Sequence, residues 1–120
     1  MNLDHLYHYR ALITECYDGD TCTADIDLGL STWIRGEKLR LTRINAPEVR
    51  GDERPLGLEA RDFIRGLITG KEVLLQTIKD KKEKYGRYLA EIWVRNEAGE
   101  LVNVNDLMVA SGHARYQNYE

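Results

Sequence analysis

Residues 9–28 read YRALITECYDGDTCTADIDL, and they are the most informative part of the sequence because they predict two strands joined by a tight turn. Tyr9–Tyr17 and Thr21–Leu28 are rich in Ile, Thr and Tyr and contain alternating residues, which is typical of half-buried strands. Asp18-Gly19 lies between them and is a strong hairpin signal, since glycine adopts a positive φ at no steric cost. We therefore expect an antiparallel pair near the start of the chain.

A third strand is predicted over Glu37–Ile44. Leu39 and Leu41 fall on one face of this segment, and polar residues fall on the other. Ile44 breaks the alternation, which predicts a bulge or a strand end just before Pro47.

A helix beginning near Pro55 is the clearest element in the sequence. Its apolar residues recur with the 3.6-residue helical period, and Gly70 ends it. Two further strands, Lys71–Lys79 and Tyr88–Arg95, come after it. The predicted apolar stripe of the helix consists of Leu56, Ala60, Phe63, Ile64, Leu67 and Ile68.

A short closing helix begins near Asn103 or Asn105 and ends at Gly112. Its buried positions are predicted to be Val104, Leu107 and Met108. The whole order over residues 1–120 predicts one domain that is mainly β with helices (α+β). It suits a five-stranded Greek-key barrel of OB type, with a helix between strands 3 and 4 and a short helix after strand 5. A small α+β sandwich fits this order nearly as well.

Composition excludes several classes of protein. The 120 residues include 17 Lys+Arg and 20 Asp+Glu, a formal charge of −3, and 42% of them are hydrophobic. This is an ordinary globular composition, and its acidic balance argues against a protein that coats DNA by charge alone. No apolar run approaches the roughly 18–20 residues of a membrane span. The polar first ten residues do not resemble a secretory signal, so we expect a cytoplasmic protein without a membrane partner.

The cysteines and histidines predict no metal centre of their own. Cys16 and Cys22 flank Gly19 but lack a zinc-site spacing and cannot build a disulfide framework, so we expect free thiols. The three histidines, expected to be structural or surface residues, are His5, His8 and His113.

Asp18 and Asp20 stand on either side of the hairpin glycine. Such a pair is common in simple turns. It also presents carboxylate oxygens that suit Ca²⁺ or Mg²⁺. An EF-hand loop is excluded, because Cys22 and Thr23 occupy positions where that loop needs Asp or Asn and then Gly.

Residues 39–48, LRLTRINAPE, carry a second candidate group. One interpretation is a strand that exits into a loop with solvated charges. The other is that Asn45 and a neighbouring carbonyl oxygen complete a hard-cation site, which leaves Glu48 free to act as a general base.

The segment Lys79–Arg87 is a third candidate, with five Lys/Arg against two Asp/Glu. It is either an exposed basic hairpin turn or a surface for phosphate contacts. Tyr85 within it is suited to stacking on a base.

In their order along the chain, Asp18-Gly19-Asp20-Thr21, Arg40–Glu48 and Lys84-Tyr85-Gly86-Arg87 resemble the staphylococcal nuclease (thermonuclease) family. The resemblance extends over about Tyr9–Ala114 and implies the OB-type barrel. It also implies a Ca²⁺-dependent endonuclease, or one that uses Mg²⁺ or Mn²⁺. The implied reaction cleaves single-stranded DNA and RNA by in-line attack of water and leaves 3′-phosphates. We expect a monomer; the alternative is a nucleic-acid- or protein-binding module on the same fold.

The resemblance further implies a role for each matching residue. The implied cation ligands are Asp20, Asn45 and the backbone carbonyl of Ala46, with Asp18 in the outer shell. The implied catalytic groups are the general base Glu48 and the two arginines Arg40 and Arg87. The implied nucleotide contacts are Lys84 and Tyr85.

Three departures from the family pattern matter for function. Asn45 supplies a neutral oxygen where the family has a carboxylate, so we expect weaker metal binding, and the preferred ion becomes an open choice between Ca²⁺, Mg²⁺ and Mn²⁺. Ala46 changes less, because any residue provides a backbone carbonyl. The chain ends at Glu120 without a third helix, and Tyr116 or Tyr119 is expected to replace the nucleotide-stacking tyrosines.

Overall fold

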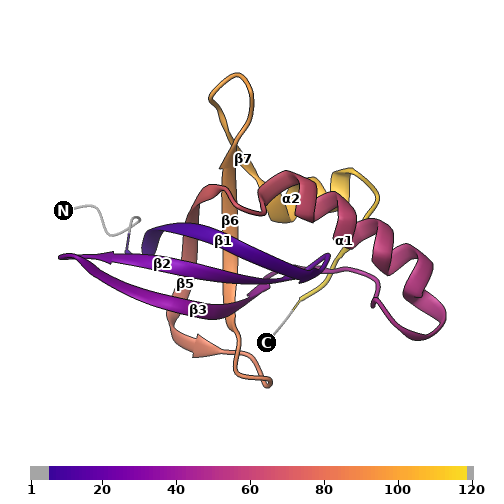
Figure 1. Ribbon diagram of the computed structural model, residues 1–120. Helices are drawn as coiled ribbons and strands as arrows, with labels where there is room; N and C mark the ends of the chain where they lie inside the picture. Colours follow the sequence, from indigo (N-terminus) through magenta and orange to yellow (C-terminus); the bar gives the residue numbers. More distant parts are fainter. Residues whose placement is uncertain (1–5, 119–120) are drawn as a thin grey trace.

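The computed structural model describes residues 6–118, and their core is a closed barrel of five strands (Figure 1). Antiparallel pairing gives the strand order β3-β2-β1-β5-β6, and a parallel pairing of Leu39–Leu41 with Tyr88–Ala90 closes the barrel between β3 and β6. The predicted mainly β, OB-type barrel with helices is confirmed. The five barrel strands are β1 (His8–Asp18), β2 (Thr21–Gly29), β3 (Thr32–Leu41), β5 (Glu72–Lys82) and β6 (Tyr88–Arg95).

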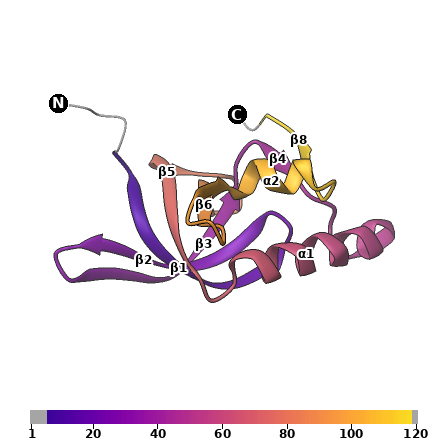
Figure 2. The same ribbon diagram turned by 90° about the horizontal axis from the view of Figure 1, so that it is seen from above.

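Besides the barrel strands, the described residues form two helices, one 3-10 turn and three short strands, and Figure 2 shows both helices on the side away from the β2–β3 hairpin. The first helix lies between β3 and β5 and packs against β1, while the second follows β6 along the chain. Neither helix is long and apolar enough to cross a membrane. These elements are β4 (Ile44–Asn45), the 3-10 turn η1 (Gly51–Glu53), α1 (Arg54–Ile68), β7 (Leu101–Asn103), α2 (Val104–Ala110) and β8 (Arg115–Tyr116).

The core follows from the period-2 alternation of the strands and from one face of α1. Ala11 and Ile13 of β1 are fully buried, and α1 buries Ala60, Ile64 and Ile68. The prediction was wrong for Leu56, which was assigned to the buried apolar stripe of the helix but is 60% exposed in its first turn. Leu107 of α2 is only half-buried, whereas Val104 and Met108 are fully buried as predicted.

The β2–β3 hairpin is longer than predicted, since β3 begins at Thr32 and not at Glu37. Leu30 and Ser31 form its turn with positive φ values of 53° and 61°. Turns with positive φ are usually formed by glycine or asparagine, so Leu30 and Ser31 gave no sign of this turn in the sequence. Register shifts in the β2–β3 pairing also interrupt the alternation that marks a strand.

The other strand boundaries differ in smaller ways. β3 ends at Leu41, and Arg43, with a φ of 70°, separates it from the two-residue β4. β5 runs on to Lys82 instead of ending at Lys79. The three-residue β7 was not predicted, because so short a strand shows no alternation.

Gly19 was predicted to supply a positive φ in the hairpin turn, but the structure requires a glycine here for close packing. It is not among the residues with a positive φ in the described part of the chain. A Cβ at this position would lie 2.7 Å from the Cβ of Ala46 and 2.9 Å from that of Ala60. Gly19 therefore lets the hairpin turn pack directly against the Ala46 loop and α1.

The cysteines and the described histidines agree with their structural interpretation. Cys16 and Cys22 face each other across β1 and β2 as buried free thiols, with their sulfurs 3.4 Å apart. His8 contacts the Leu6 carbonyl, and the ring of His113 packs on Phe63. His5 lies outside the described residues.

Candidate active site

The β1–β2 turn places Asp20 at the centre of a buried polar cluster. Its carboxylate is 5% exposed and accepts a 2.7 Å hydrogen bond from the Ala46 N–H and a 3.2 Å bond from the Thr21 hydroxyl. Arg40 pairs with it at 3.1 Å, and Asp18 accepts a hydrogen bond from the Asp20 N–H. The turn is thus joined to β3 and to the loop after β4 through a single carboxylate.

This environment changes the acidity of Asp20. Burial, together with the nearby Asp18 carboxylate, raises its pKa to about 7. The positive charge of Arg40 and the Ala46 N–H oppose the shift. A negative charge at Asp20 is therefore costly, and additional positive charge beside it stabilises the ionised form.

Arg40 connects the predicted cation ligands. Its guanidinium is almost fully buried, donates a 2.7 Å hydrogen bond to the Leu41 carbonyl and reaches the Asn45 amide oxygen at 3.4 Å. The side chains of Asp20 and Asn45 therefore both contact the Arg40 guanidinium, although 25 positions separate them in the sequence. The structure brings together a carboxylate oxygen and an amide oxygen of the predicted metal set.

The Glu48 loop rests on the backbone of α1. The Glu48 side chain is 67% exposed, and its carboxylate lies 3.9 Å from the Arg50 Nε atom. The backbone N–H of Glu48 donates a hydrogen bond to the Glu53 carboxylate. A Cβ on Gly57 would lie 2.0 Å from the Glu48 carbonyl oxygen. Gly57 is thus required for this close approach, which sets the position of the predicted base.

Arg87 is held in place by Glu83. The two side chains form a bidentate pair, with both contacts at 3.0 Å, and Arg87 also donates to the Thr21 hydroxyl at 3.1 Å. Glu83 additionally accepts hydrogen bonds from the Tyr85 and Arg87 N–H groups of the same turn. Hydrogen bonds from Arg87 lower the pKa of Glu83, which keeps the pair ionised.

A cleft of about 830 Å³ joins these groups. Asp18, Asp20, Arg40 and Asn45 line it on one side, and the β5–β6 turn with Lys84, Tyr85 and Arg87 lines it on another. Ala46 and Glu48 also belong to its lining. Seven Lys/Arg and four Asp/Glu line the cleft, so it is positive in a chain whose net charge is −3.

The aromatic residues differ from the prediction in one respect. Tyr85 lines the cleft, is 71% exposed and has Lys84 and Arg87 within about 5 Å of its ring. Tyr116 is turned away, since its hydroxyl donates to Asp106 at 2.9 Å and it is not part of the cleft lining. Tyr119, the other predicted substitute, lies outside the described residues.

Several contributors to the site were missed from the sequence, and four of them illustrate why. Glu83 was counted only as part of a charged run, although its spacing of four from Arg87 was visible. Gly57 showed no sign of its contact with the Glu48 loop. Tyr17 and Lys38, which line the cleft, lie on strands where alternation alone does not show which end carries the site.

The oxygen donors of the cluster suit a hard cation. Asp20 offers a carboxylate and Asn45 an amide oxygen, with Asp18 adjacent. Within residues 6–118, however, no three Asp, Glu, His or Cys side chains gather as a metal-binding group. The donor set fits Ca²⁺ or Mg²⁺ in chemistry, with fewer negative charges than a tight site has.

The chain is thus an OB-type barrel with one positively charged cleft, and acidic, basic and aromatic side chains line that cleft. The family model described as staphylococcal nuclease homologue matches residues 38–120. The chain therefore belongs to the staphylococcal nuclease family, and the resemblance seen in the motifs is confirmed.

Individual relatives agree with this assignment. The thermonuclease of Staphylococcus hyicus is 31% identical over 85% of this chain, and that of Staphylococcus intermedius is 32% identical over 72%. An uncharacterized protein of Methanocaldococcus jannaschii is 28% identical over 90% of the chain. The matches cover 59%, 56% and 49% of the archaeal, S. hyicus and S. intermedius proteins, so the chain spans about half the length of these curated relatives.

Proposed function

We propose that this chain is a divalent-cation-dependent nuclease that hydrolyses phosphodiester bonds in DNA and RNA, with a preference for single strands and 3′-phosphate products. One observation carries the proposal, namely that Asp20, Arg40, Glu48 and Arg87 all line one positively charged cleft. The names of the two staphylococcal relatives support nuclease chemistry.

Glu48 has the exposure that a general base in this reaction needs. Its carboxylate faces solvent from the cleft lining, where an attacking water has access. The N–H contact to Glu53 and the packing on Gly57 hold its backbone. Glu48 is proposed to accept the proton of the water as the water attacks the phosphorus in line.

Arg40 and Arg87 are proposed to bind the equatorial oxygens of the phosphate. A planar guanidinium can hold two oxygens at once, so it stabilises charge that grows in the transition state. Both are already fixed, Arg40 by Asp20 and Arg87 by Glu83, which reduces the reorganisation needed on binding.

A cation would be held by Asp20, Asn45 and the carbonyl of Ala46, with Asp18 nearby. When bound, Ca²⁺, or Mg²⁺ or Mn²⁺ in its place, neutralises a nonbridging phosphate oxygen and orients water. Lys84 supplies positive charge to the nucleotide, and the exposed ring of Tyr85 offers a stacking surface.

Cleavage assays with product analysis test the proposal. Single-stranded DNA and RNA are incubated with the protein in Ca²⁺, Mg²⁺, Mn²⁺ or EDTA, and the product ends are identified. We expect cleavage that requires a cation and leaves 3′-phosphates. A folded protein that cleaves neither substrate with any of the three ions would overturn the proposal.

The binding-module alternative has one observation in its favour. Asn45 stands where the family has a carboxylate, so the proposed cation site has few negative charges. In the described part of the chain no three Asp, Glu, His or Cys side chains lie together as a metal-binding group. Tight oligonucleotide binding in EDTA, with no turnover in any cation, would select this alternative.

A further inference from the structure

The barrel has a second opening, at the end away from the active site. Figure 1 shows the β1–β2 turn beside α1 and the β2–β3 turn at the opposite end of the strands. A cavity of about 140 Å³ lies between the strands on the side of the β2–β3 hairpin, and its lining includes Tyr7, Tyr9, Leu28 and Ile34. None of these residues lines the active-site cleft.

The strand alternation explains which side chains reach this cavity. Ala11 and Ile13 of β1 are buried in the barrel, so Tyr9 occupies the next inward position along the strand. Tyr88 stands in the same relation to the buried Ala90 of β6. Both tyrosines pack against the core and continue its interior toward the open end.

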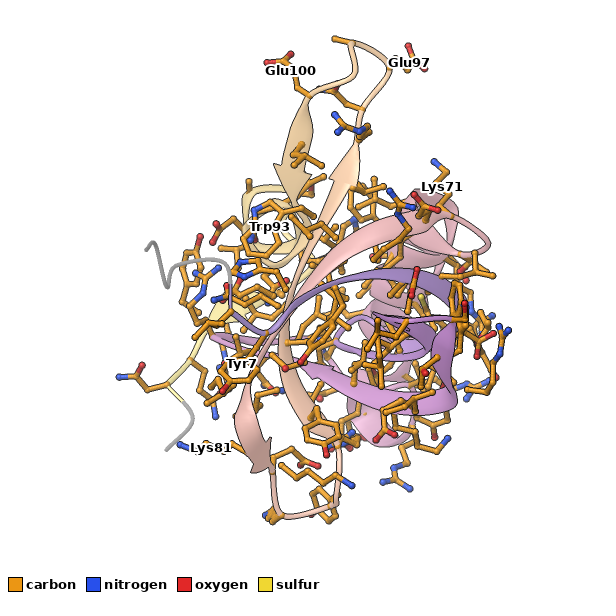
Figure 3. All side chains as sticks on the ribbon, turned by 90° about the vertical axis from the view of Figure 1, so that its left-hand side faces the viewer. Tyr7, Lys71, Lys81, Trp93, Glu97 and Glu100 are labelled. Atoms are coloured by element: carbon orange, nitrogen blue, oxygen red, sulfur yellow. The ribbon has the colours of Figure 1, made fainter. Side chains whose placement is uncertain are left out.

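Tyr7 adds a third aromatic ring at the start of β1. Its φ of 61° is unusual for a residue with a large side chain, and its carbonyl accepts a 3.0 Å hydrogen bond from the Thr77 N–H. Figure 3 shows Tyr7 well away from Glu97 and Glu100, which lie at the tip of the β6–β7 hairpin. Three tyrosines from two strands and the segment before them thus line one small cavity.

Glu37 is the unexpected residue at this end of the barrel. It pairs with Ala24 across the β2–β3 ladder and precedes the buried Leu39 by two positions, so it occupies an inward-facing position. Among the described residues that line the cavity, it alone carries a charge. Among the side chains that the structure describes, its half-buried carboxylate forms no hydrogen bond or ion pair. A charge in such a position normally has a partner.

Tyrosine faces and a carboxylate together favour a positively charged ligand. The faces of aromatic rings attract cations, and ammonium groups with apolar substituents are bound in this way because little hydration is lost. Tyr88 already has such a contact, because the Lys82 ammonium lies 4.7 Å from the centre of its ring. The aliphatic side chains of Ile26, Leu28 and Ile34 would contact the apolar part of the ligand.

We propose that this opening is a binding site for an organic ammonium ion, in which Glu37 neutralises the charge and Tyr7, Tyr9 and Tyr88 surround the alkyl groups. The cavity volume equals roughly five water-sized groups, which matches a compact alkylated ammonium head. A lysine side chain of another protein and a free small amine share this chemistry. The site is separate from the proposed nuclease cleft, and it does not depend on cleavage activity.

The test compares a cation with a neutral molecule of the same shape. Choline and its uncharged isostere 3,3-dimethyl-1-butanol are titrated into the isotopically labelled protein, and the NMR signals of Tyr7, Tyr9 and Tyr88 are followed. We expect saturable shifts with choline and about tenfold weaker binding of the isostere. Equal binding of the two, or no shift at these tyrosines, would overturn the proposal.

Two variants locate the charge recognition. Glu37→Gln should weaken choline binding about tenfold without unfolding the protein, since no described partner is lost. Glu48→Gln, in the other cavity, should bind choline as the unchanged protein does. Unaltered binding by folded Glu37→Gln would contradict the assignment.

Two further probes separate the sources of the ligand. n-Butylammonium represents a free amine, and a short peptide with a central trimethyl-lysine represents a protein partner. Tighter binding of the peptide assigns the site to a protein, and tighter binding of the free amines assigns it to a small molecule.

Discussion

At the scale of single residues, the site depends on side chains that hold other side chains. Arg40 and Arg87, the proposed phosphate ligands, are each fixed by a carboxylate, Asp20 and Glu83 respectively. Such partners orient a guanidinium before the substrate arrives. Removal of Glu83 should affect catalysis more than the fold, whereas removal of Asp20 should also destabilise the fold because it takes away the carboxylate paired with a buried guanidinium.

Glu83→Gln is expected to lower kcat about tenfold or more while KM changes little, because Arg87 loses its bidentate partner and its orientation. Steady-state cleavage kinetics measure this. Glu83→Asp should restore part of kcat, and Glu97→Gln, in the distant β6–β7 turn, should change nothing. If Glu83→Gln left kcat as it is, Glu83 would have no positioning role.

The same pair makes a small pH-dependent contribution to stability. The folded-state pKa of Glu83 lies below its ordinary value, so the folded protein binds fewer protons and this contribution is complete above that ordinary value. It is lost as the pH falls through the lowered pKa. The stability difference between the unchanged protein and Glu83→Gln, measured by denaturant unfolding, should therefore shrink in acid.

Asn45→Asp is expected to tighten Ca²⁺ binding about tenfold or more, because a carboxylate replaces an amide oxygen among the proposed ligands. Isothermal titration calorimetry measures the affinity. Ser111→Asp, after α2 and outside the cleft lining, controls for the added charge. Unchanged or weaker Ca²⁺ binding in Asn45→Asp would show that Asn45 is not a ligand.

At the scale of elements, the position of the Glu48 loop depends on the first turns of α1. Gly57 has no room for a side chain, because the Glu48 carbonyl occupies that place. Gly66 lies in the same helix, and a Cβ added there would meet no atom within 4 Å. The two glycines therefore form a matched pair for substitution.

Gly57→Ala is expected to displace the Glu48 loop and to reduce cleavage at least tenfold, with some loss of stability. Gly66→Ala should keep full activity and gain up to about 1 kcal/mol of stability from helix propensity. Cleavage rates and thermal unfolding of both variants decide this. Equal activity in both would mean that the close contact at Gly57 does not position the base.

Elements with strong local signals were predictable from the sequence, and elements held by distant contacts were not. The first hairpin, α1 and the span of β6 follow from strand composition and helical periodicity, although Gly19 does not adopt the positive φ that its turn was predicted to use. The Leu30-Ser31 turn and β7 do not, because the first uses residues that rarely adopt a positive φ and the second is too short to alternate.

The candidate site shows the same limit. Asp20, Arg40, Glu48 and Arg87 were predicted because short motifs carry them, and all four line one cleft. Tyr116, which was predicted to contact the nucleotide, is absent from the cleft lining and bonds Asp106, a contact that depends on how β8 pairs with β4. Arg43 had no expected role, yet it joins Glu91 of β6 to Asp106 of α2, and only the fold brings those two carboxylates together.

At the scale of the whole molecule, charge is distributed unevenly. The chain carries −3 overall, while its cleft has seven basic and four acidic residues. A polyanion is repelled by the surface at large and attracted by the cleft. Both effects act through solvent and are screened by salt.

Raising the salt concentration from about 50 to about 200 mM is therefore expected to increase KM several-fold with little change in kcat, because phosphate contacts by lysine and arginine weaken with salt. Cleavage of a single-stranded oligonucleotide at fixed Ca²⁺ measures both constants. Lys84→Gln should reduce the salt dependence of KM, whereas Lys71→Gln, just before β5 and outside the cleft, should not. A KM that ignores salt would contradict binding through the cleft.

Cleavage by the Glu48→Gln variant shows whether Glu48 is the general base of a nuclease. The carboxylate is exposed, so its loss should leave the melting temperature nearly unchanged, and the rate of Ca²⁺-dependent cleavage should fall by about 10²–10⁴-fold because no group remains to accept the proton of the water. Glu97→Gln serves as the matched control and should cleave normally. A folded Glu48→Gln protein that cleaves single-stranded DNA at the unchanged rate would remove Glu48 from the mechanism and contradict the account.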